Sequence, residues 1–123
     1  MFENWNSLGV FTGDLKINGV NSLQKKYSVD GIAGCETQAD WRFAPEARKF
    51  HRLFGHGEET RSAVGFNCAG EKKLRDQPGG TAMMTIGRLS ASVLDTGVDY
   101  ENLGRWSWVL VGGPRKRTRY VVL

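Results

Sequence analysis

Short apolar runs separated by glycine recur along the chain, and most of them are rich in β-branched or aromatic residues. Runs of this length and composition are typical of β-strands, because a helix needs a longer stretch to bury one face. The pattern therefore predicts strands throughout the chain. We expect them at residues 10–17, 31–35, 63–66, 81–86, 91–94, 106–111 and 119–123.

Two segments have helical features instead. Residues 21–27 predict a turn or two of helix, and residues 45–54 predict a longer helix. Pro45 suits the first helical position, where its missing N–H would be unpaired anyway, and Gly55 can adopt the left-handed conformation that ends a helix. Between this helix and the strand at residue 81, the polar, glycine-containing composition predicts a loop at residues 69–79.

The order of these elements predicts an α+β fold. An early portion of strand and helix is followed by an antiparallel meander, so we expect a mostly antiparallel sheet with helices on one face. No repeat or linker is visible, and residues 1–123 are predicted to be a single domain. Gly-Gly-Pro within residues 112–117 predicts a hairpin turn between the last two strands. The final apolar strand, residues 119–123, predicts an unpaired sheet edge that favours self-association.

Composition excludes some classes of protein. With 40% hydrophobic and 24% charged residues, the chain does not have the composition of a disordered polypeptide. No apolar run approaches the roughly 18 residues that a membrane-spanning helix needs, and the N-terminus has no signal-peptide pattern, so no membrane association is expected. Cys35 and Cys68 lack the spacing of a disulfide-rich secreted domain. This usage favours an intracellular location, nuclear or cytoplasmic.

The formal net charge of +4 is concentrated in the second half of the chain. Four cations fall in or beside the predicted hairpin turn: Arg115, Lys116, Arg117 and Arg119. They are candidates for weak binding to the backbone of a nucleic acid, and a solvated hairpin tip is the alternative. Trp106 and Trp108 lie on the preceding strand, where they could stack on bases, although packing on a sheet is the commoner role.

Residues 30–41 contain the best candidate for chemistry. A run of small apolar residues delivers a carboxylate, Glu36, at its C-terminal end. Mg²⁺ takes one or two protein carboxylates and keeps several waters, so Glu36 would suffice as a protein ligand. A solvated glutamate that ends a strand is the alternative, and the pattern alone favours it. His51 and His56 are not spaced as a zinc site requires, nor are the two cysteines.

Three stretches together resemble the endonuclease/exonuclease/phosphatase family, in particular the endonuclease domains of non-LTR retroelement proteins. They are residues 16–22, 35–37 and 78–84, and residues 104–108 and 118–123 fit the strands that follow in such domains. The resemblance covers residues 10–123 and corresponds to the N-terminal half of the family's domain. It implies half of a four-layer α/β/β/α sandwich and Mg²⁺-dependent hydrolysis of phosphodiester bonds in nucleic acid.

The resemblance also implies roles for single residues. Glu36 would be the metal-binding glutamate of an E-T motif. Asn18 would be the second asparagine of the family's strand-one motif, N-x-N-G, with Lys16 in place of the first. We therefore expect Glu36 and Asn18 on neighbouring strands, as the candidate catalytic residues. The family's later motifs, G-D-x-N and S-D-H, have no counterpart in the 123 residues, which implies a partial domain that is inactive alone.

Three functional hypotheses follow. The chain is a truncated or remnant Mg²⁺-dependent phosphodiesterase, or a non-catalytic module that binds nucleic acid or protein through its basic hairpin, or a polypeptide without a selected function. Salt-dependent DNA binding without cleavage would favour the second hypothesis. The absence of both binding and cleavage would favour the third.

Overall fold

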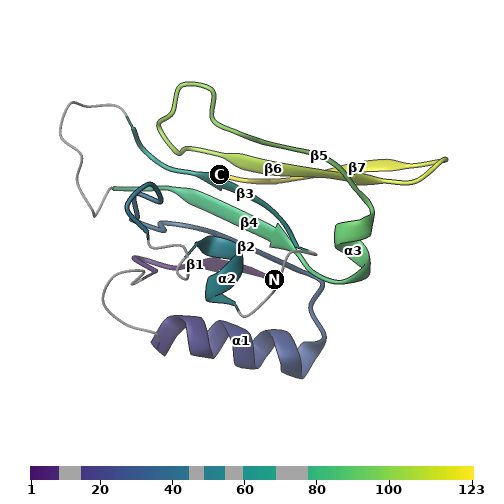
Figure 1. The fold of residues 1–123 in the computed structure, drawn as a ribbon, viewed down its shortest axis with the longest axis horizontal. Helices are drawn as coiled ribbons and strands as arrows, with labels where there is room; N and C mark the ends of the chain where they lie inside the picture. Colours follow the sequence, from purple (N-terminus) through teal and green to yellow (C-terminus); the bar gives the residue numbers. More distant parts are fainter. Residues whose placement is uncertain (9–14, 45–48, 55–59, 69–77) are drawn as a thin grey trace.

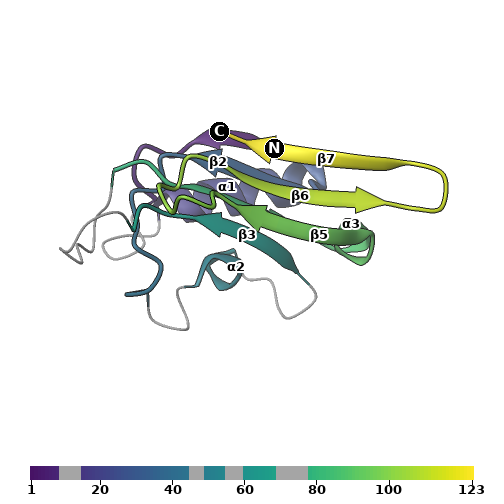
Figure 2. The same ribbon diagram turned by 90° about the horizontal axis from the view of Figure 1, so that it is seen from above.

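The structure is a computed structural model that describes residues 1–8, 15–44, 49–54, 60–68 and 78–123. Two β-sheets pack against each other, and two helices cover the outer face of one sheet, so the described residues form three layers (Figures 1 and 2). The α+β class and the mostly antiparallel pairing are confirmed. The expected placement on one face holds for two of the three described helices, while Leu89 of the third packs against the core between the sheets.

The first sheet has four strands in the order β1-β2-β4-β3. Their bounds are β1 Phe2–Asn4, β2 Gly31–Cys35, β3 Arg61–Gly65 and β4 Thr81–Thr85. β1 runs parallel to β2, whereas the other neighbours are antiparallel. The sequence predicts β2, β3 and β4 to within two residues at each end. It does not predict β1, because a strand of three residues is too short to show an alternation.

The second sheet is the expected antiparallel meander of β5 (Val93–Val98), β6 (Ser107–Gly112) and β7 (Arg117–Val122). The strand predicted at residues 91–94 begins later and extends further, because the chain first forms a short helix, α3 (Arg88–Ala91). β6 and β7 form the predicted hairpin, in which the N–H of Gly113 donates to the carbonyl of Lys116 at 3.0 Å.

Helix α1 (Leu15–Tyr27) corrects one prediction. The strand predicted for residues 10–17 is wrong over residues 15–17, which form the first turn of α1, while residues 10–14 lie outside the described residues. Ile17 and Val20 are three positions apart and both are buried, which is a helical period. Ile17 and Val20 are β-branched and lie on either side of Gly19, and this combination is also typical of strands, so the sequence alone does not distinguish the two.

The C-terminal end of α1 has a recognisable stop. Ser28 adopts a left-handed φ of 50°, and the N–H of Val29 donates to the carbonyl of Gln24 at 3.1 Å. This is the bond of a Schellman motif, which satisfies a carbonyl that the helix leaves unpaired.

The helix predicted at residues 45–54 is represented by the short α2 (Phe50–Leu53). Residues 45–48 lie outside the described residues, as do residues 69–77 of the predicted loop. Over the parts of the chain that the structure describes, no helix is long and apolar enough to cross a membrane.

Two apolar cores hold the layers together. The core between the first sheet and the helices is rich in aromatic rings, and the ring centroid of Phe50 lies 5.7 Å from that of Trp5, 5.6 Å from that of Trp41 and 5.3 Å from that of Phe54. The core between the sheets is smaller and mainly aliphatic. Its buried members are Ala63, Met83, Val109, Val111 and Val122.

Gly34 on β2 lacks a side chain, and this allows β1 and Trp5, the residue that follows β1, to approach the backbone of β2 closely. A Cβ atom at Gly34 would lie 2.8 Å from the indole carbons of Trp5 and would overlap the carbonyl oxygen of Glu3. The indole of Trp5 therefore lies directly on the backbone of β2, within the aromatic core.

We expect Gly34→Ala to lower the free energy of unfolding by about 1–3 kcal/mol, because the added methyl group must displace a buried indole or strand β1. Gly19→Ala is the matched control. Gly19 lies in the middle of α1, where nothing is within 4 Å of an added Cβ, so this change should raise stability by about 0.5–1 kcal/mol. Urea unfolding of both variants measures the difference. Equal stabilities would contradict the close approach of Trp5 to Gly34.

Candidate functional site

The carboxyl ends of β1 and β2 meet because the two strands are parallel neighbours, with Asn4 opposite Cys35. The segments that leave these strands stay joined beyond the regular ladder. Three backbone N–H groups of the first segment donate to the second: Trp5 to Cys35 at 3.0 Å, Ser7 to Glu36 at 2.8 Å, and Leu8 to Thr37 at 3.1 Å. Polar side chains from both segments are thereby brought to one edge of the first sheet.

The backbone of both segments is unusual at this edge. Asn6 and Ser7 have φ values of 39° and 71°, and Glu36 and Gln38 have values of 58° and 50°. Left-handed φ at residues other than glycine is uncommon and costs of order 1 kcal/mol or more each. Such residues cluster at functional sites, so their concentration in two adjacent segments marks this edge as a candidate site.

Gln38 connects the two segments through its side chain. Its Nε2 atom lies 3.5 Å from Oδ1 of Asn6 and 3.4 Å from Oε2 of Glu36, so one amide group makes long hydrogen bonds to oxygens from both segments. Asn4 supports the turn, since its Oδ1 accepts the N–H of Asn6 at 3.0 Å. A half-buried carboxylate and an amide oxygen therefore face one shared donor.

A glycine pair supports the Glu36 segment from its other side. The N–H of Thr37 donates to the carbonyl of Gly80 at 3.2 Å, and that of Gln38 donates to Gly79 at 2.8 Å. Both glycines have positive φ, 77° and 90°, and a Cβ at Gly80 would overlap the Thr37 hydroxyl. The segment before β4 thus holds the residues after β2 in place, and two of the stretches that carry the family resemblance are in direct contact.

Of the two candidate catalytic residues, Glu36 has the predicted location and Asn18 does not. Glu36 follows directly after β2, which is an interior strand. Asn18 is not on a neighbouring strand, so that expectation is wrong: it is exposed on α1, and its carbonyl accepts the hydroxyl of Ser22 at 2.9 Å. The asparagine beside the Glu36 segment is Asn6. Asn4-Trp5-Asn6 at the end of β1 is an N-x-N pattern that sequence reasoning overlooked.

Lys16 is also misplaced by the sequence prediction, since it lies on α1 and not on the first strand. It nevertheless reaches the site. Its Nζ atom donates to the carbonyl oxygens of Trp5, Asn6 and Ser7 at 2.6, 2.6 and 2.9 Å.

The donor set at this edge suits a hard cation. Mg²⁺ prefers oxygen ligands and is usually held by one or two carboxylates with water in its remaining positions. Glu36 offers a carboxylate and Asn6 an amide oxygen. Among the described residues no group of three or more His, Cys, Asp or Glu side chains could hold a metal ion, so a cation here would depend on amide oxygens and water as well as on Glu36.

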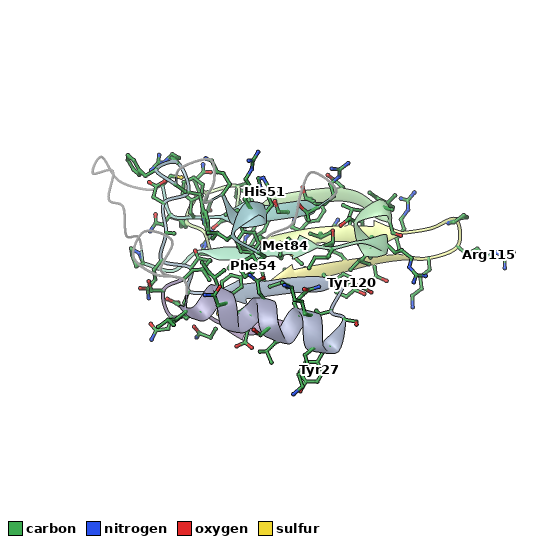
Figure 3. All side chains as sticks on the ribbon, turned by 60° about the horizontal axis from the view of Figure 1, so that its bottom comes forward. Tyr27, His51, Phe54, Met84, Arg115 and Tyr120 are labelled. Carbon is green, nitrogen blue, oxygen red and sulfur yellow. The ribbon has the colours of Figure 1, made fainter. Side chains whose placement is uncertain are left out.

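The basic residues lie far from this edge. Arg115, Lys116 and Arg117 are exposed at the hairpin tip, which projects from the end of the molecule where β2 begins (Figures 1 and 3). Arg119 is further along β7, and its guanidinium carbon lies 4.4 Å from the ring centroid of Trp108. The tip therefore contains three cations, with Arg119 stacked on the sheet, and a single small ligand cannot contact both Glu36 and the tip.

Trp106 and Trp108 have different surroundings. The ring of Trp106 packs against Tyr100, with centroids 6.0 Å apart, and precedes β6. Trp108 lies across Gly97 on β5, where a Cβ atom would be 2.6 Å from the indole. Trp108 therefore has the sheet-packing contact that the commoner interpretation of the pattern predicts, whereas Trp106 packs on a residue of the loop that follows β5.

No protein-family model matches the sequence, and no curated protein sequence matches it at a significant level. The functional assignment therefore depends on the geometry of residues 4–7 and 36–38 and on the motifs that they contain.

Asp99 lies in the loop that follows β5 and has a clearly lowered pKa. It is buried, and its Oδ2 accepts the N–H and Nε of Arg105 at 3.2 and 3.0 Å, while its Oδ1 accepts the N–H of Glu101 at 3.0 Å. The hydrogen bond from the Arg105 side chain lowers the pKa of Asp99 to about 2, in spite of the opposing effect of burial. A bridge between Asn67 and Leu103 ties this loop to the segment after β3.

The low pKa of Asp99 predicts a pH dependence of stability. The folded state favours the charged carboxylate, so the contribution is complete above the ordinary pKa of 3.8 and is lost as the pH falls through about 2. We expect the free energy of unfolding of the wild type to decrease over this range more steeply than that of Asp99→Asn. Asp95→Asn, which removes an exposed carboxylate on β5, should keep the wild-type slope. Urea unfolding at stepwise pH measures all three, and parallel curves would contradict the role of Asp99.

Proposed function

We propose that this chain is the N-terminal part of a Mg²⁺-dependent phosphodiesterase of the endonuclease/exonuclease/phosphatase type that acts on nucleic acid in its complete form. One observation carries the proposal: the N-x-N residues that end β1 and the E-T residues that follow β2 lie at one edge of the first sheet. In the family that the sequence resembles, these two motifs arrange the metal ion and the phosphate. With Asn4 and Asn6 after the first strand, the chain matches the family's N-x-N pattern more closely than it does with Asn18.

Each residue has a distinct task in this proposal. Glu36 binds the cation through its carboxylate. The side-chain amide of Asn6 can bind the metal through its oxygen or donate an N–H to a phosphate. Gln38 orients both through the hydrogen bonds of its amide. Mg²⁺, when bound, would polarise a phosphoryl oxygen and lower the pKa of a bound water.

The site within the 123 residues is partial. Hydrolysis also needs a base within reach of the attacking water and a group that stabilises the departing oxygen. In the family, G-D-x-N and S-D-H motifs supply these groups, and the sequence has neither. We therefore propose that the 123-residue polypeptide binds a divalent cation and does not turn over substrate.

Cation binding tests the proposal. Mn²⁺ should broaden the amide NMR signals of residues 4–7 and 36–38 before all others, because a paramagnetic ion relaxes the nearest nuclei most strongly. Glu36→Gln removes the proposed anionic ligand and should weaken Mn²⁺ binding at least about tenfold. Asp95→Asn removes the same charge from β5 and should bind Mn²⁺ as the wild type does.

Two outcomes would contradict the proposal. Broadening centred elsewhere, or equal in Glu36→Gln and the wild type, would remove the metal site. Nicking of plasmid DNA in Mg²⁺ or Mn²⁺ that disappears in Glu36→Gln would show that these residues form a complete site, contrary to the partial site proposed.

A second candidate function is a non-catalytic one, in which the basic hairpin binds nucleic acid or an acidic protein. Its support is the exposure of Arg115, Lys116 and Arg117 on one projecting turn. Because the tip is remote from Glu36, binding there would not depend on the metal site. An exposed edge supports self-association as well, since Tyr120 and Val121 on β7 are 50% and 53% exposed.

We expect weak nucleic-acid binding at the tip to be strongly salt dependent. If three cations contact three phosphates, the logarithm of the binding constant should fall against the logarithm of salt concentration with a slope of roughly −2 to −3. Changing Arg115, Lys116 and Arg117 to alanine together should abolish that slope. The matched control changes Lys25, Lys26 and Arg88 to alanine, which removes the same charge elsewhere and should leave the slope unchanged. Fluorescence anisotropy with a labelled duplex measures both, and a slope that survives the first variant would contradict the assignment.

We also propose that the protein acts inside the cell, in the nucleus or the cytoplasm. The structural support is that Cys35 and Cys68 are both free thiols. Unpaired cysteines are typical of proteins from reducing compartments.

A further inference from the structure

Lys16 makes an unusual set of contacts. An ammonium group has three N–H donors, and the acceptors of Lys16 are three consecutive backbone carbonyls, those of Trp5, Asn6 and Ser7. Two of the three distances, both 2.6 Å, are short for N–H···O bonds, and the third is 2.9 Å; a charged donor shortens such bonds. A single side chain thus binds one face of the turn that follows β1.

The backbone N–H groups of the same turn are bound by other groups. The N–H of Ser7 donates to Glu36, and that of Asn6 donates to the side chain of Asn4. The turn contains two consecutive left-handed residues, a conformation that persists only when its surroundings stabilise it. Lys16 binds the carbonyl groups of the turn and the Glu36 segment binds an N–H group, and together they supply that stabilisation.

The position of Lys16 is itself determined by packing. Lys16 lies in the first turn of α1, next to Ile17, which is buried against the first sheet together with Val20. The docking of α1 therefore carries the ammonium group to the turn, and the location of the turn depends on a helix that follows it in the chain.

We propose that Lys16 is a positioning residue, which holds the backbone of residues 5–7 so that the side chain of Asn6 faces Glu36 and Gln38. The inference rests on the proposed function, since Asn6 and Glu36 are the proposed groups for the cation. It adds to that function a residue from outside both motifs and from a different element of the fold.

The sign of one effect separates positioning from simple electrostatics. Lys16 is a cation close to a site proposed for a cation, and by charge alone its removal should strengthen Mn²⁺ binding. If Lys16 instead maintains the turn, its removal should weaken binding in spite of the lost repulsion. The two explanations thus predict opposite changes.

The experiment uses Lys16→Met, which keeps most of the side-chain length without the donors, and Lys25→Met as the matched control at the far end of α1. We expect Lys16→Met to weaken Mn²⁺ binding about tenfold, as the loss of a supporting residue commonly does, while Lys25→Met changes it little. Amide hydrogen exchange should quicken at Ser7 and Leu8 and stay at the wild-type rate in β4. If Lys16→Met does not fold, Lys16→Gln replaces it.

The outcomes are distinguishable. Mn²⁺ affinity equal to or above that of the wild type in Lys16→Met, with unchanged exchange at Ser7 and Leu8, would overturn the role of Lys16. A wild type that binds no Mn²⁺ at residues 4–7 and 36–38 would defeat the proposed function. In that case the exchange measurement alone decides: faster exchange at Ser7 and Leu8 supports the positioning role, and unchanged exchange overturns it.

Discussion

The rest of the structure depends on the pairing of two parallel segments that do not stop pairing where their strands end. Beyond Asn4 and Cys35 the regular ladder gives way to three further backbone hydrogen bonds, which run through residues with left-handed φ. This continuation brings Asn6 beside the Glu36 segment and presents consecutive carbonyls to Lys16. Without it, the edge of the sheet would have polar residues and no defined arrangement of them.

The aromatic core and the candidate site share one short segment. Trp5 is buried on Gly34 among the rings of the core, while Asn4 and Asn6 on either side of it are exposed. Burial of an indole is one of the larger single contributions to a small core. The free energy that holds Trp5 in place therefore also constrains the two asparagines, so the stability of the core and the geometry of the site cannot be varied independently at this point.

The elements that the sequence predicts well are those whose signal is local. β2, β4 and the β6–β7 hairpin have apolar runs or a Gly-Gly-Pro turn of their own, and Glu36 is identified by the run that precedes it. β1 has only three residues, and its partner lies about thirty residues away, so only tertiary pairing reveals it. Asn18 and Asn6 both stand in asparagine-containing patterns, and only the strand at residues 2–4 identifies Asn6 as the asparagine that follows the first strand. The contacts of Lys16 arise from helix docking and have no sequence signature.

The location of the hairpin has a consequence for how the molecule would meet a polyanion. Three cations lie on the hairpin tip at one end of its longest axis, and the carboxyl end of β2, which Glu36 follows, lies toward the other end (Figure 1). In the field of a polyanion, a molecule charged in this way turns its cationic end forward before contact, because orientation by long-range electrostatics precedes short-range binding. First contact and any chemistry at Glu36 would then occur at opposite ends of the molecule. A nucleic-acid strand bound by the hairpin tip would therefore have to extend along the protein to reach Glu36.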